Sequence, residues 1–285
     1  MRDNSQAIKH WPYTTGVTWL LLVAGLAQAV SLAWPFAGVF QGAAQGWLQC
    51  VAMVVLAGVL DRAQSNQQAF AAGWLFSFAW LVGSFWWLFI SMNTYGGLPA
   101  PVAALAVGLL AAGLALFYGS ACFVFYAVTK TGVGVLPRAS AFAATWMLAE
   151  MLRGTLWTGF PWGAVGYAHI DSLLQHWAPW MGVYGLCALP AFIAMAVAAE
   201  RRQHVSKSRL RYIVVVLCAG ALGYMWITSP SRQVADEYHS AKPLSVTLLQ
   251  GNIPQDLKFG EGVSLALRDY REALLSSTSD LIVTP

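Results

Sequence analysis

The segment FAAGWLFSFAWLVGSFWWLFIS, from Phe70 to Ser91, decides the class of this protein. It has no charged side chain, and it is long enough for a helix that crosses the hydrocarbon core of a bilayer, which takes about 20 mostly apolar residues. The composition of the whole chain agrees, because 58% of its 285 residues are hydrophobic and only 10% are charged. Soluble domains carry about 25% charged residues, so we expect most of this chain to lie in lipid.

Seven segments of the chain are predicted to span the membrane as helices. In residue numbers they are 17–36, 44–60, 70–91, 102–129, 139–152, 182–199 and 212–228. The first follows Arg2 and Lys9, as the apolar part of a signal peptide would, but it lacks a small-residue cleavage site and further apolar segments come after it. We therefore interpret it as a membrane anchor. The fifth segment is the shortest of the seven.

The distribution of basic residues predicts the orientation of these helices. If the N-terminus is cytoplasmic, the cytoplasmic segments hold ten basic residues, whereas the opposite loops, around Gln41, around Asn93 and from 153 to 180, hold only Arg153. Loops rich in Lys and Arg remain on the cytoplasmic side. The net charge of +4 therefore indicates membrane topology and not nucleic-acid binding, and the residues after 228 are expected outside the cytoplasm. The ten are Arg2, Lys9, Arg62, Lys130, Arg138, Arg201, Arg202, Lys207, Arg209 and Arg211.

Two connections share this outer side with the end of the chain: SMNTYGGLPAP (91–101) and RGTLWTGFPWGAVGYAHID (153–171). The second is rich in aromatic residues that alternate with glycines, among them Trp157, Phe160 and Trp162. One interpretation is an aromatic belt at the level of the lipid headgroups. The other is a loop that dips into the bilayer and shapes an opening for a lipid tail. Composition alone favours the belt, and both interpretations stay open.

Few titratable residues lie in or next to these two connections. Glu150 and Arg153 lie three residues apart at the outer end of the fifth segment, so they can meet on one helix face. An ionisable residue inside a span is a candidate for function, although a pair at a helix end can also extend to the headgroups. His169 and His176 flank Asp171 without the spacing of a ligand set, and we expect both histidines at the surface.

The cysteines indicate no metal centre. All four lie inside apolar segments, without CxxC spacing and without a histidine at metal-ligand spacing. Buried cysteines usually act as small apolar packing residues. We therefore predict no metal site, no disulfide framework and no cofactor. The four are Cys50, Cys122, Cys187 and Cys218.

The end of the chain has a different composition, because charged residues return at ordinary density after residue 229. Residues 246–249, VTLL, are typical of a buried strand, and a loop with Gly251 and Pro254 follows. Residues 262–277 have a helical apolar stripe, and 281–283 are a second strand. A β-α-β unit needs further elements to bury its faces, so we expect a truncated piece of a larger enzyme. The stripe consists of Val263, Leu267, Tyr270 and Leu274.

Several ordered motifs resemble those of bacterial apolipoprotein N-acyltransferases. They begin at the third apolar segment and continue to the last residue of the chain. They are GSFWWLFISMNTYGGLPAP (83–101), LAEMLRGTLWTGFPWGAVGYAHID (148–171), APWMGVYGL (178–186), LLQGNIPQDLKFGEG (248–262) and DLIVTP (280–285).

This resemblance implies a fold and an activity. The fold is a mainly α membrane protein, with about seven transmembrane helices followed by the first β-α-β unit of an α/β nitrilase-like (carbon-nitrogen hydrolase) domain. Residues 1–228 are the transmembrane domain, 229–243 a linker and 244–285 the truncated nitrilase-like domain. The family resides in the bacterial inner membrane with this domain in the periplasm. It transfers an acyl chain from a phospholipid to the N-terminal diacylglyceryl-cysteine of a lipoprotein.

The resemblance also assigns residues. A cysteine thiolate carries the acyl group as a thioester, a glutamate is the general base and a lysine stabilises the oxyanion. The base is expected immediately after Pro285, so no catalytic residue is expected in this chain and the chain alone is expected to be inactive. Lys258 does not match the family lysine. Trp162 and Phe160 lie on the loop near the lipid opening, and Phe259 stands where the family usually has Trp, without the indole N–H donor.

Other functions remain as alternatives. The chain is also compatible with a non-catalytic lipid-binding or regulatory membrane protein descended from the enzyme. A split gene whose second product supplies the missing half is another option. A transporter is less well supported, because the spans show no pair of helices interrupted by Gly or Pro.

Overall fold

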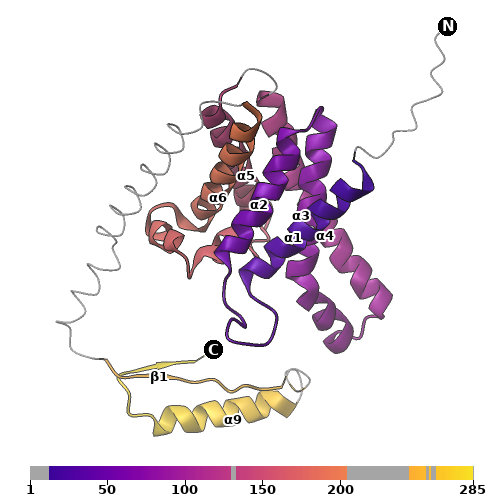
Figure 1. Ribbon diagram of the computed structural model, residues 1–285. Coiled ribbons are helices and arrows are strands. Elements are labelled where there is room, and N and C mark those ends of the chain that lie inside the picture. The colour runs from indigo at the N-terminus through magenta and orange to yellow at the C-terminus, as the bar shows by residue number, and fades with distance from the viewer. Residues whose placement is uncertain (1–12, 130–132, 204–243, 255–256, 258–260, 285) are drawn as a thin grey trace.

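The computed structural model of the chain describes residues 13–129, 133–203, 244–254, 257 and 261–284. Residues 13–203 form a bundle whose long helices are labelled α1 to α6 in Figure 1. α3 continues into a π-helical turn, η1 (Ser91–Tyr95), and two 3-10 turns, η2 (Val165–His169) and η3 (Leu173–Trp177), precede α6. The long helices are α1 (Thr15–Leu32), α2 (Gly46–Asp61), α3 (Asn66–Ile90), α4 (Ala100–Val128), α5 (Val135–Thr155) and α6 (Ala178–Gln203).

Six of the seven predicted segments coincide with these helices, and the seventh, 212–228, lies outside the described residues. Four stretches of the described chain are long and apolar enough to cross a membrane: Thr15–Leu32, Asn66–Tyr95, Ala100–Val128 and Leu173–Glu200. α2 is apolar but has only 16 residues. α5 has a low hydropathy because it carries Arg138, Glu150 and Arg153. The prediction of membrane-spanning helices is thus confirmed for four of them.

The charged side chains of α5 are turned into the protein. Arg138 Nε lies 3.1 Å from Asp61 Oδ1 at the end of α2, and both side chains are nearly buried. Arg138 also donates a hydrogen bond of 2.8 Å to the carbonyl of Thr129. Ionisable residues in membrane bundles normally pair inside the protein in this way. The exposed side chains of α5 include Leu136 and Leu148, so its outer face is apolar in spite of its charges.

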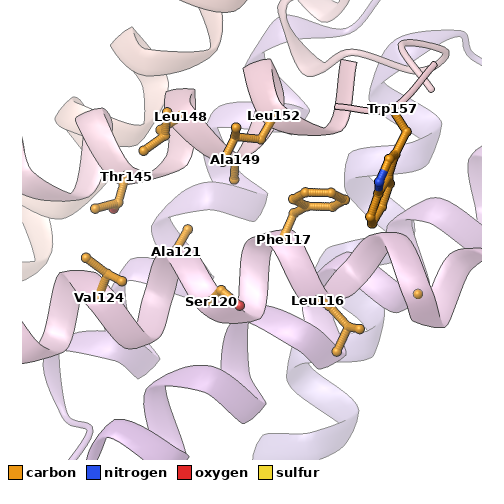
Figure 2. A pocket seen from close by; sticks show the side chains of 11 residues that line it. Leu116, Phe117, Ser120, Ala121, Val124, Thr145, Leu148, Ala149, Leu152 and Trp157 are labelled. Atoms are coloured by element: carbon orange, nitrogen blue, oxygen red, sulfur yellow. The ribbon is translucent and has the colours of Figure 1, made fainter. Parts of the chain in front are cut away.

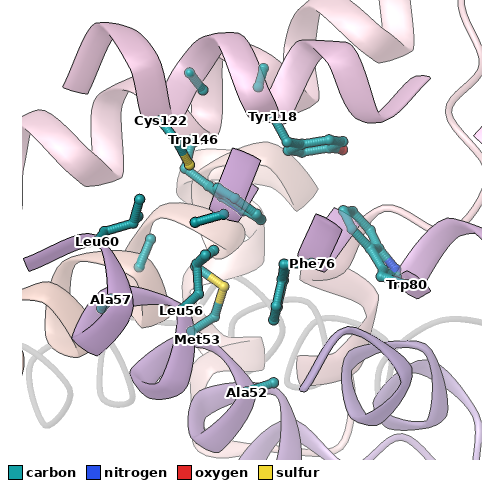
Figure 3. Packing of buried hydrophobic residues seen from close by; sticks show 14 of the residues in the cluster. Ala52, Met53, Leu56, Ala57, Leu60, Phe76, Trp80, Tyr118, Cys122 and Trp146 are labelled. Atoms are coloured by element: carbon teal, nitrogen blue, oxygen red, sulfur yellow. The ribbon is translucent and has the colours of Figure 1, made fainter. Parts of the chain in front are cut away.

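The core of the bundle is built around three aromatic side chains. Trp80 of α3, Tyr118 of α4 and Trp146 of α5 are fully buried, and their ring centroids lie between 4.9 and 6.5 Å apart. Figure 3 shows these rings beside the apolar side chains of α2. α3 and α4 approach closely at Gly73, where a Cβ atom would meet the Cys122 side chain. Such approaches at small residues let membrane helices associate.

The end of the chain contains a strand, a helix and a second strand. β1 (Val246–Leu248) pairs in parallel with β2 (Leu281–Val283), and α9 (Glu261–Ser276) connects them. In the register of this pair, Val246 is opposite Leu281 and Leu248 is opposite Val283. All four of these side chains are at least 43% exposed, so one face of the two-stranded sheet is uncovered. The assignment of this unit to a nitrilase-like domain stays a prediction.

The predicted apolar stripe of α9 does not lie in a core. Val263, Leu267 and Leu274 are exposed, and only Tyr270 of the four is half-buried. The half-buried face contains Ala266 and Ala273 instead, together with Tyr270, whose hydroxyl accepts a hydrogen bond of 2.8 Å from the Gly251 N–H. The Tyr270 bond joins α9 to the loop that follows β1, and three of the four predicted stripe residues remain exposed.

A carboxylate joins the beginnings of the two strands. Asp280 Oδ2 accepts hydrogen bonds from the Ser245 N–H (3.0 Å) and from the Ser245 hydroxyl (2.7 Å). The hydroxyl in turn accepts a bond of 2.9 Å from the Asp280 N–H. The bonds from Ser245 hold the pKa of Asp280 below its usual value, because they stabilise the ionised carboxylate.

We expect Asp280→Ala to increase amide hydrogen exchange in β1 and β2 at neutral pH. Because its folded pKa is lowered, the Asp280 carboxylate stabilises the strand pair above its usual pKa of 3.8, and this contribution is lost as the pH falls through the lower folded value. The difference in exchange rate between Asp280→Ala and the parent protein should therefore become smaller at a pH below the folded pKa of Asp280.

The control is Asp269→Ala, which removes an exposed carboxylate paired only with the exposed Arg268 on the surface of α9. Exchange measured by mass spectrometry in detergent micelles at two pH values gives the comparison. An Asp280→Ala effect of equal size at both pH values would contradict the role of the ionised carboxylate.

Candidate functional site

One buried arginine, Arg153, contacts three helices and a loop at one end of the bundle. Arg153, near the end of α5, is 1% exposed. Its Nε donates a hydrogen bond of 2.7 Å to the Tyr118 hydroxyl on α4, and its Nη2 lies 2.9 Å from Glu150 Oε2 on its own helix. Its guanidinium carbon lies 5.7 Å from the ring centroid of Trp80 on α3, within the range of a cation–π contact.

The sequence left open whether Glu150 and Arg153 extend to the headgroups, and the structure excludes this. Both side chains have no exposed surface, and they form an ion pair across one turn of the helix. Separating two charges in an apolar interior costs far more than it does in water. The pair therefore fixes the guanidinium in one position, from which its remaining nitrogen reaches the loop that follows α5.

The remaining guanidinium nitrogen, Nη1, binds backbone carbonyls of the loop. Arg153 Nη1 donates to the carbonyl of Phe160 and, at 2.9 Å, to the carbonyl of Trp162. The Phe160 N–H donates back to the Arg153 carbonyl at 2.7 Å. The planar guanidinium has five N–H donors in a fixed fork, and this geometry allows one side chain to bind several acceptors at once.

The two aromatic residues predicted at a lipid opening, Phe160 and Trp162, both lie on this loop. Phe160 is half-buried, and its ring centroid lies 4.9 Å from that of Phe85 on α3 and 4.8 Å from that of Trp162. Trp162 is 57% exposed. The third predicted residue, Phe259, lies outside the described residues.

The loop has an unusual backbone at its start. Trp157 has φ = 57°, a left-handed conformation that is uncommon for residues other than glycine, and its side chain is 90% exposed. Two residues later, Gly159 has φ = 72°, and a Cβ atom there would collide with the carbonyl of Gly154. The chain thus turns back sharply after α5. Strained conformations of this kind are concentrated at functional sites.

The Trp157 ring stands at one end of an apolar groove between α4 and α5 (Figure 2). The groove has a volume of about 340 Å³. Its only hydroxyl side chains are Ser120 and Thr145, and the Thr145 hydroxyl already donates to the helix carbonyl of Ala141. The groove therefore offers hydrocarbon contacts and no charge. It is lined by Gly113, Leu116, Phe117, Ser120, Ala121, Val124, Thr145, Leu148, Ala149, Leu152 and Trp157.

Trp157, Phe160 and Trp162 all lie on the loop after α5, but only Trp157 lines the groove. The aromatic-rich connection of the sequence therefore divides into two parts. Trp157 closes the groove, and the segment around Phe160 and Trp162 is held against the bundle by Arg153. Sequence reasoning did not identify the groove or the roles of Tyr118 and Trp80.

The expectation of two surface histidines is wrong for His169. It is 1% exposed, and its Nε2 lies 3.1 Å from Gln49 Oε1 on α2, while Nδ1 lies 3.2 Å from the Ser172 hydroxyl. Burial lowers the pKa of His169 to about 4, so the ring is neutral at neutral pH. η2 packs against α1 and α2, and this tertiary contact covers the ring. His176 is half-buried.

Among the described residues, no cysteine has the environment of a nucleophile. Cys122 and Cys187 are buried in α4 and α6, and Cys50 is half-buried in α2. The Cys187 thiol donates only to the Tyr184 carbonyl of its own helix. The part of the chain that the structure describes also contains no group of three His, Cys, Asp or Glu side chains that suits a metal ion. Cys218 lies outside the described residues.

The helices and this site define a helical protein with four candidate membrane spans and an apolar groove between α4 and α5. Comparisons with known proteins give the family. Residues 29–196, more than half of the chain, match the family model described as apolipoprotein N-acyltransferase N-terminal domain. The chain belongs to the apolipoprotein N-acyltransferase family.

Relatives from several bacteria agree with this assignment. The chain is 45% identical to the apolipoprotein N-acyltransferase of Verminephrobacter eiseniae over 93% of its length, and this match covers 50% of that protein. It is 39% identical to that of Ralstonia nicotianae over 84% of its length, covering 45% of that protein. It is 35% identical to that of Chromobacterium violaceum over 93% of its length, covering 49% of that protein. The chain thus spans about half the length of the relatives it matches.

We expect Arg153→Lys to release the loop around Phe160 and Trp162. Lysine keeps the positive charge but lacks the planar fork, so it cannot bind Glu150, Tyr118 and both loop carbonyls together. Hydrogen exchange of the loop amides, above all that of Phe160, should be several-fold faster in the variant.

The control is Arg62→Lys, which changes an exposed arginine just after α2. It should leave the exchange of the loop unchanged. Equal protection of the Phe160 amide in the parent protein and in Arg153→Lys would show that the arginine does not hold the loop.

Proposed function

We propose that this chain is the membrane-embedded part of an enzyme that transfers an acyl chain from a phospholipid to the N-terminal diacylglyceryl-cysteine of a lipoprotein. The observation that carries the proposal is the apolar groove between α4 and α5 in a chain of this family. A saturated acyl chain needs a long apolar surface without charge, and the lining residues supply that surface. Both the phospholipid donor and the acylated lipoprotein carry such chains.

In this proposal the groove and the loop have separate roles. The groove binds the hydrocarbon part of the donor, with the glycerol and headgroup at the Trp157 end. An indole ring prefers the boundary between hydrocarbon and headgroups, which suits that position. Trp162 and Phe160 form the neighbouring wall at the same depth, and Arg153 positions them without touching the lipid. Phe259 is proposed to contribute a ring from the loop that follows β1.

Residues 244–285 are proposed to belong to a nitrilase-like domain, with residues 1–228 as the membrane domain and 229–243 as the linker. The parallel pairing of β1 and β2 around α9 supports this, because nitrilase-like domains are α/β structures. The exposed side chains of Val246, Leu248, Leu281 and Val283 also support it, since they leave a sheet face that further elements would cover. The reacting thiolate and its base are then groups other than those the structure describes.

The membrane and the orientation are part of the proposal as well. The excess of Lys and Arg on one side supports a cytoplasmic N-terminus and a periplasmic end of the chain, in the bacterial inner membrane. Arg153 is the one basic residue in the loops that join the helices on the opposite side. Because its side chain is buried and paired, it does not weaken this excess.

A second candidate is a lipid-binding or regulatory membrane protein without catalysis. The burial of Cys122 and Cys187 favours it, since no described thiol is placed to carry an acyl group. The two candidates share the acyl-chain groove and differ in chemistry. The chain with the second half of a relative, such as that of Verminephrobacter eiseniae, fused after residue 285 separates them when it is supplied with phospholipid and a diacylglyceryl peptide. N-acylation by this fusion requires the enzyme, and its absence favours the second candidate.

We expect a phospholipid with a photoactivatable acyl chain to crosslink preferentially to α4 and α5. Ala121→Trp places a large ring in the groove and should reduce this labelling several-fold. Crosslinked peptides identified by mass spectrometry give the measurement, in vesicles of phosphatidylethanolamine and phosphatidylglycerol. For the 285-residue chain alone we expect this binding without N-acylation.

The matched control is Val23→Trp, which adds the same ring to the exposed face of α1. It should leave the labelling of α4 and α5 unchanged. Labelling distributed evenly over all exposed helices, or unaffected by Ala121→Trp, would contradict a specific acyl-chain site.

A further inference from the structure

The connection between α1 and α2, residues 33–45, is a folded hairpin. Its two sides are joined by hydrogen bonds from the Trp34 N–H to the Ala43 carbonyl (3.0 Å) and from the Gly42 N–H to the Trp34 carbonyl (2.9 Å). Gly38 and Gly42 have φ values of 136° and 79°, which allow the chain to turn. Figure 1 shows this segment extending beyond the ends of α1 and α2. We call it the α1–α2 hairpin.

The tip of the α1–α2 hairpin is apolar and exposed. Phe36 is 60% exposed, Val39 96% and Phe40 62%, and Trp47 in the first turn of α2 is 63% exposed. No Asp, Glu, Lys or Arg occurs from residue 11 to residue 60. A connection that faces water normally carries polar and charged side chains, and an apolar patch of this kind usually marks a contact surface.

The lengths of the adjoining helices place this hairpin close to the hydrocarbon. α1 has 18 residues and α2 has 16, so they are about 27 and 24 Å long at about 1.5 Å per residue. The hydrocarbon core is about 30 Å thick. A connection at the end of two such helices does not reach far into water. The pair α3 and α4 is different, because these helices have 25 and 29 residues.

Aromatic side chains mark the same depth on the neighbouring elements. A Cβ atom at Gly163 would lie 3.5 Å from Ser84 on α3 and 3.7 Å from Leu32 at the end of α1, so these three residues share one level. Trp86 lies two residues after Ser84, Trp162 directly precedes Gly163, and both tryptophans are exposed. Tryptophan is enriched where hydrocarbon meets the headgroups, and the α1–α2 hairpin begins at this level.

We propose that the α1–α2 hairpin inserts into the lipid leaflet, with Phe36, Val39 and Phe40 at the boundary between headgroups and acyl chains. The occupant of this apolar surface is lipid, because the surface carries no charge and the adjoining helix α1 also exposes apolar side chains, among them Val23 and Leu26. The hairpin bonds part of its own backbone, and the remaining polar groups find partners among headgroups and water at that depth. This inference depends on the membrane helices alone and not on the proposed acyl transfer.

The test uses an environment-sensitive fluorophore attached at position 39. The variant Val39→Cys is prepared with the four native cysteines replaced by alanine, labelled with a nitrobenzoxadiazole (NBD) dye and placed in phosphatidylethanolamine–phosphatidylglycerol vesicles. Asp171→Cys is the control, because Asp171 is exposed on the connection after α5 and carries a charge that requires water. Circular dichroism and size-exclusion chromatography verify that both variants are folded.

The proposal predicts blue-shifted emission at position 39, with strong quenching by a lipid nitroxide near the headgroups and weak quenching by iodide. The control at position 171 should show the reverse. Strong iodide quenching at position 39 would mean that the hairpin faces water, and the proposal would fail. Protection from both quenchers would mean that protein covers the tip, which would overturn lipid as its occupant.

Discussion

A buried ion pair between Glu150 and Arg153 is the interaction on which the functional end of this protein depends. Neither side chain has any exposed surface, in a bundle whose core is mainly aromatic and aliphatic. Two charges in such a place persist because they pair with each other, and further hydrogen bonds lower the cost of their burial. Tyr118 and the loop carbonyls of Phe160 and Trp162 complete the arrangement for the guanidinium. The conformation of the loop is therefore coupled to the packing of α3, α4 and α5.

This arrangement explains why the apolar groove lies between α4 and α5. α5 carries its charges inward, so its outer face is free to be apolar, and together with α4 it encloses a groove without charge. The sharp turn at Trp157 and Gly159 then directs an indole ring over one end of that groove. The same end of the bundle presents the loop held by Arg153. One end of the groove thus combines a hydrocarbon surface with an exposed aromatic side chain, which is the arrangement on which the proposed function rests.

The sequence predicted the parts of this structure that depend on local pattern. Uncharged runs identified the helices, and the three-residue spacing of Glu150 and Arg153 predicted that they meet. Tyr118 lies 35 residues before Arg153, and nothing in its own helical segment distinguishes it from a packing aromatic. His169 was misjudged for a similar reason, since Gln49, which covers it, is 120 residues away. The stripe on α9 was predicted to be buried, but Val263, Leu267 and Leu274 are exposed and the half-buried positions include Ala266 and Ala273, because the described part of this unit has no further element to cover the stripe.

The central claim is that Glu150 and Arg153 stabilise the bundle only as a pair, and a double-mutant cycle tests it most directly. Unfolding of Glu150→Gln, Arg153→Met and the double variant is measured in micelles by denaturant titration. We predict that each single change costs about 3–5 kcal/mol, because it leaves one buried group without its partner, and that the double variant recovers much of that loss. Costs that simply add, within about 0.5 kcal/mol, would show that the two side chains act independently and would contradict the account.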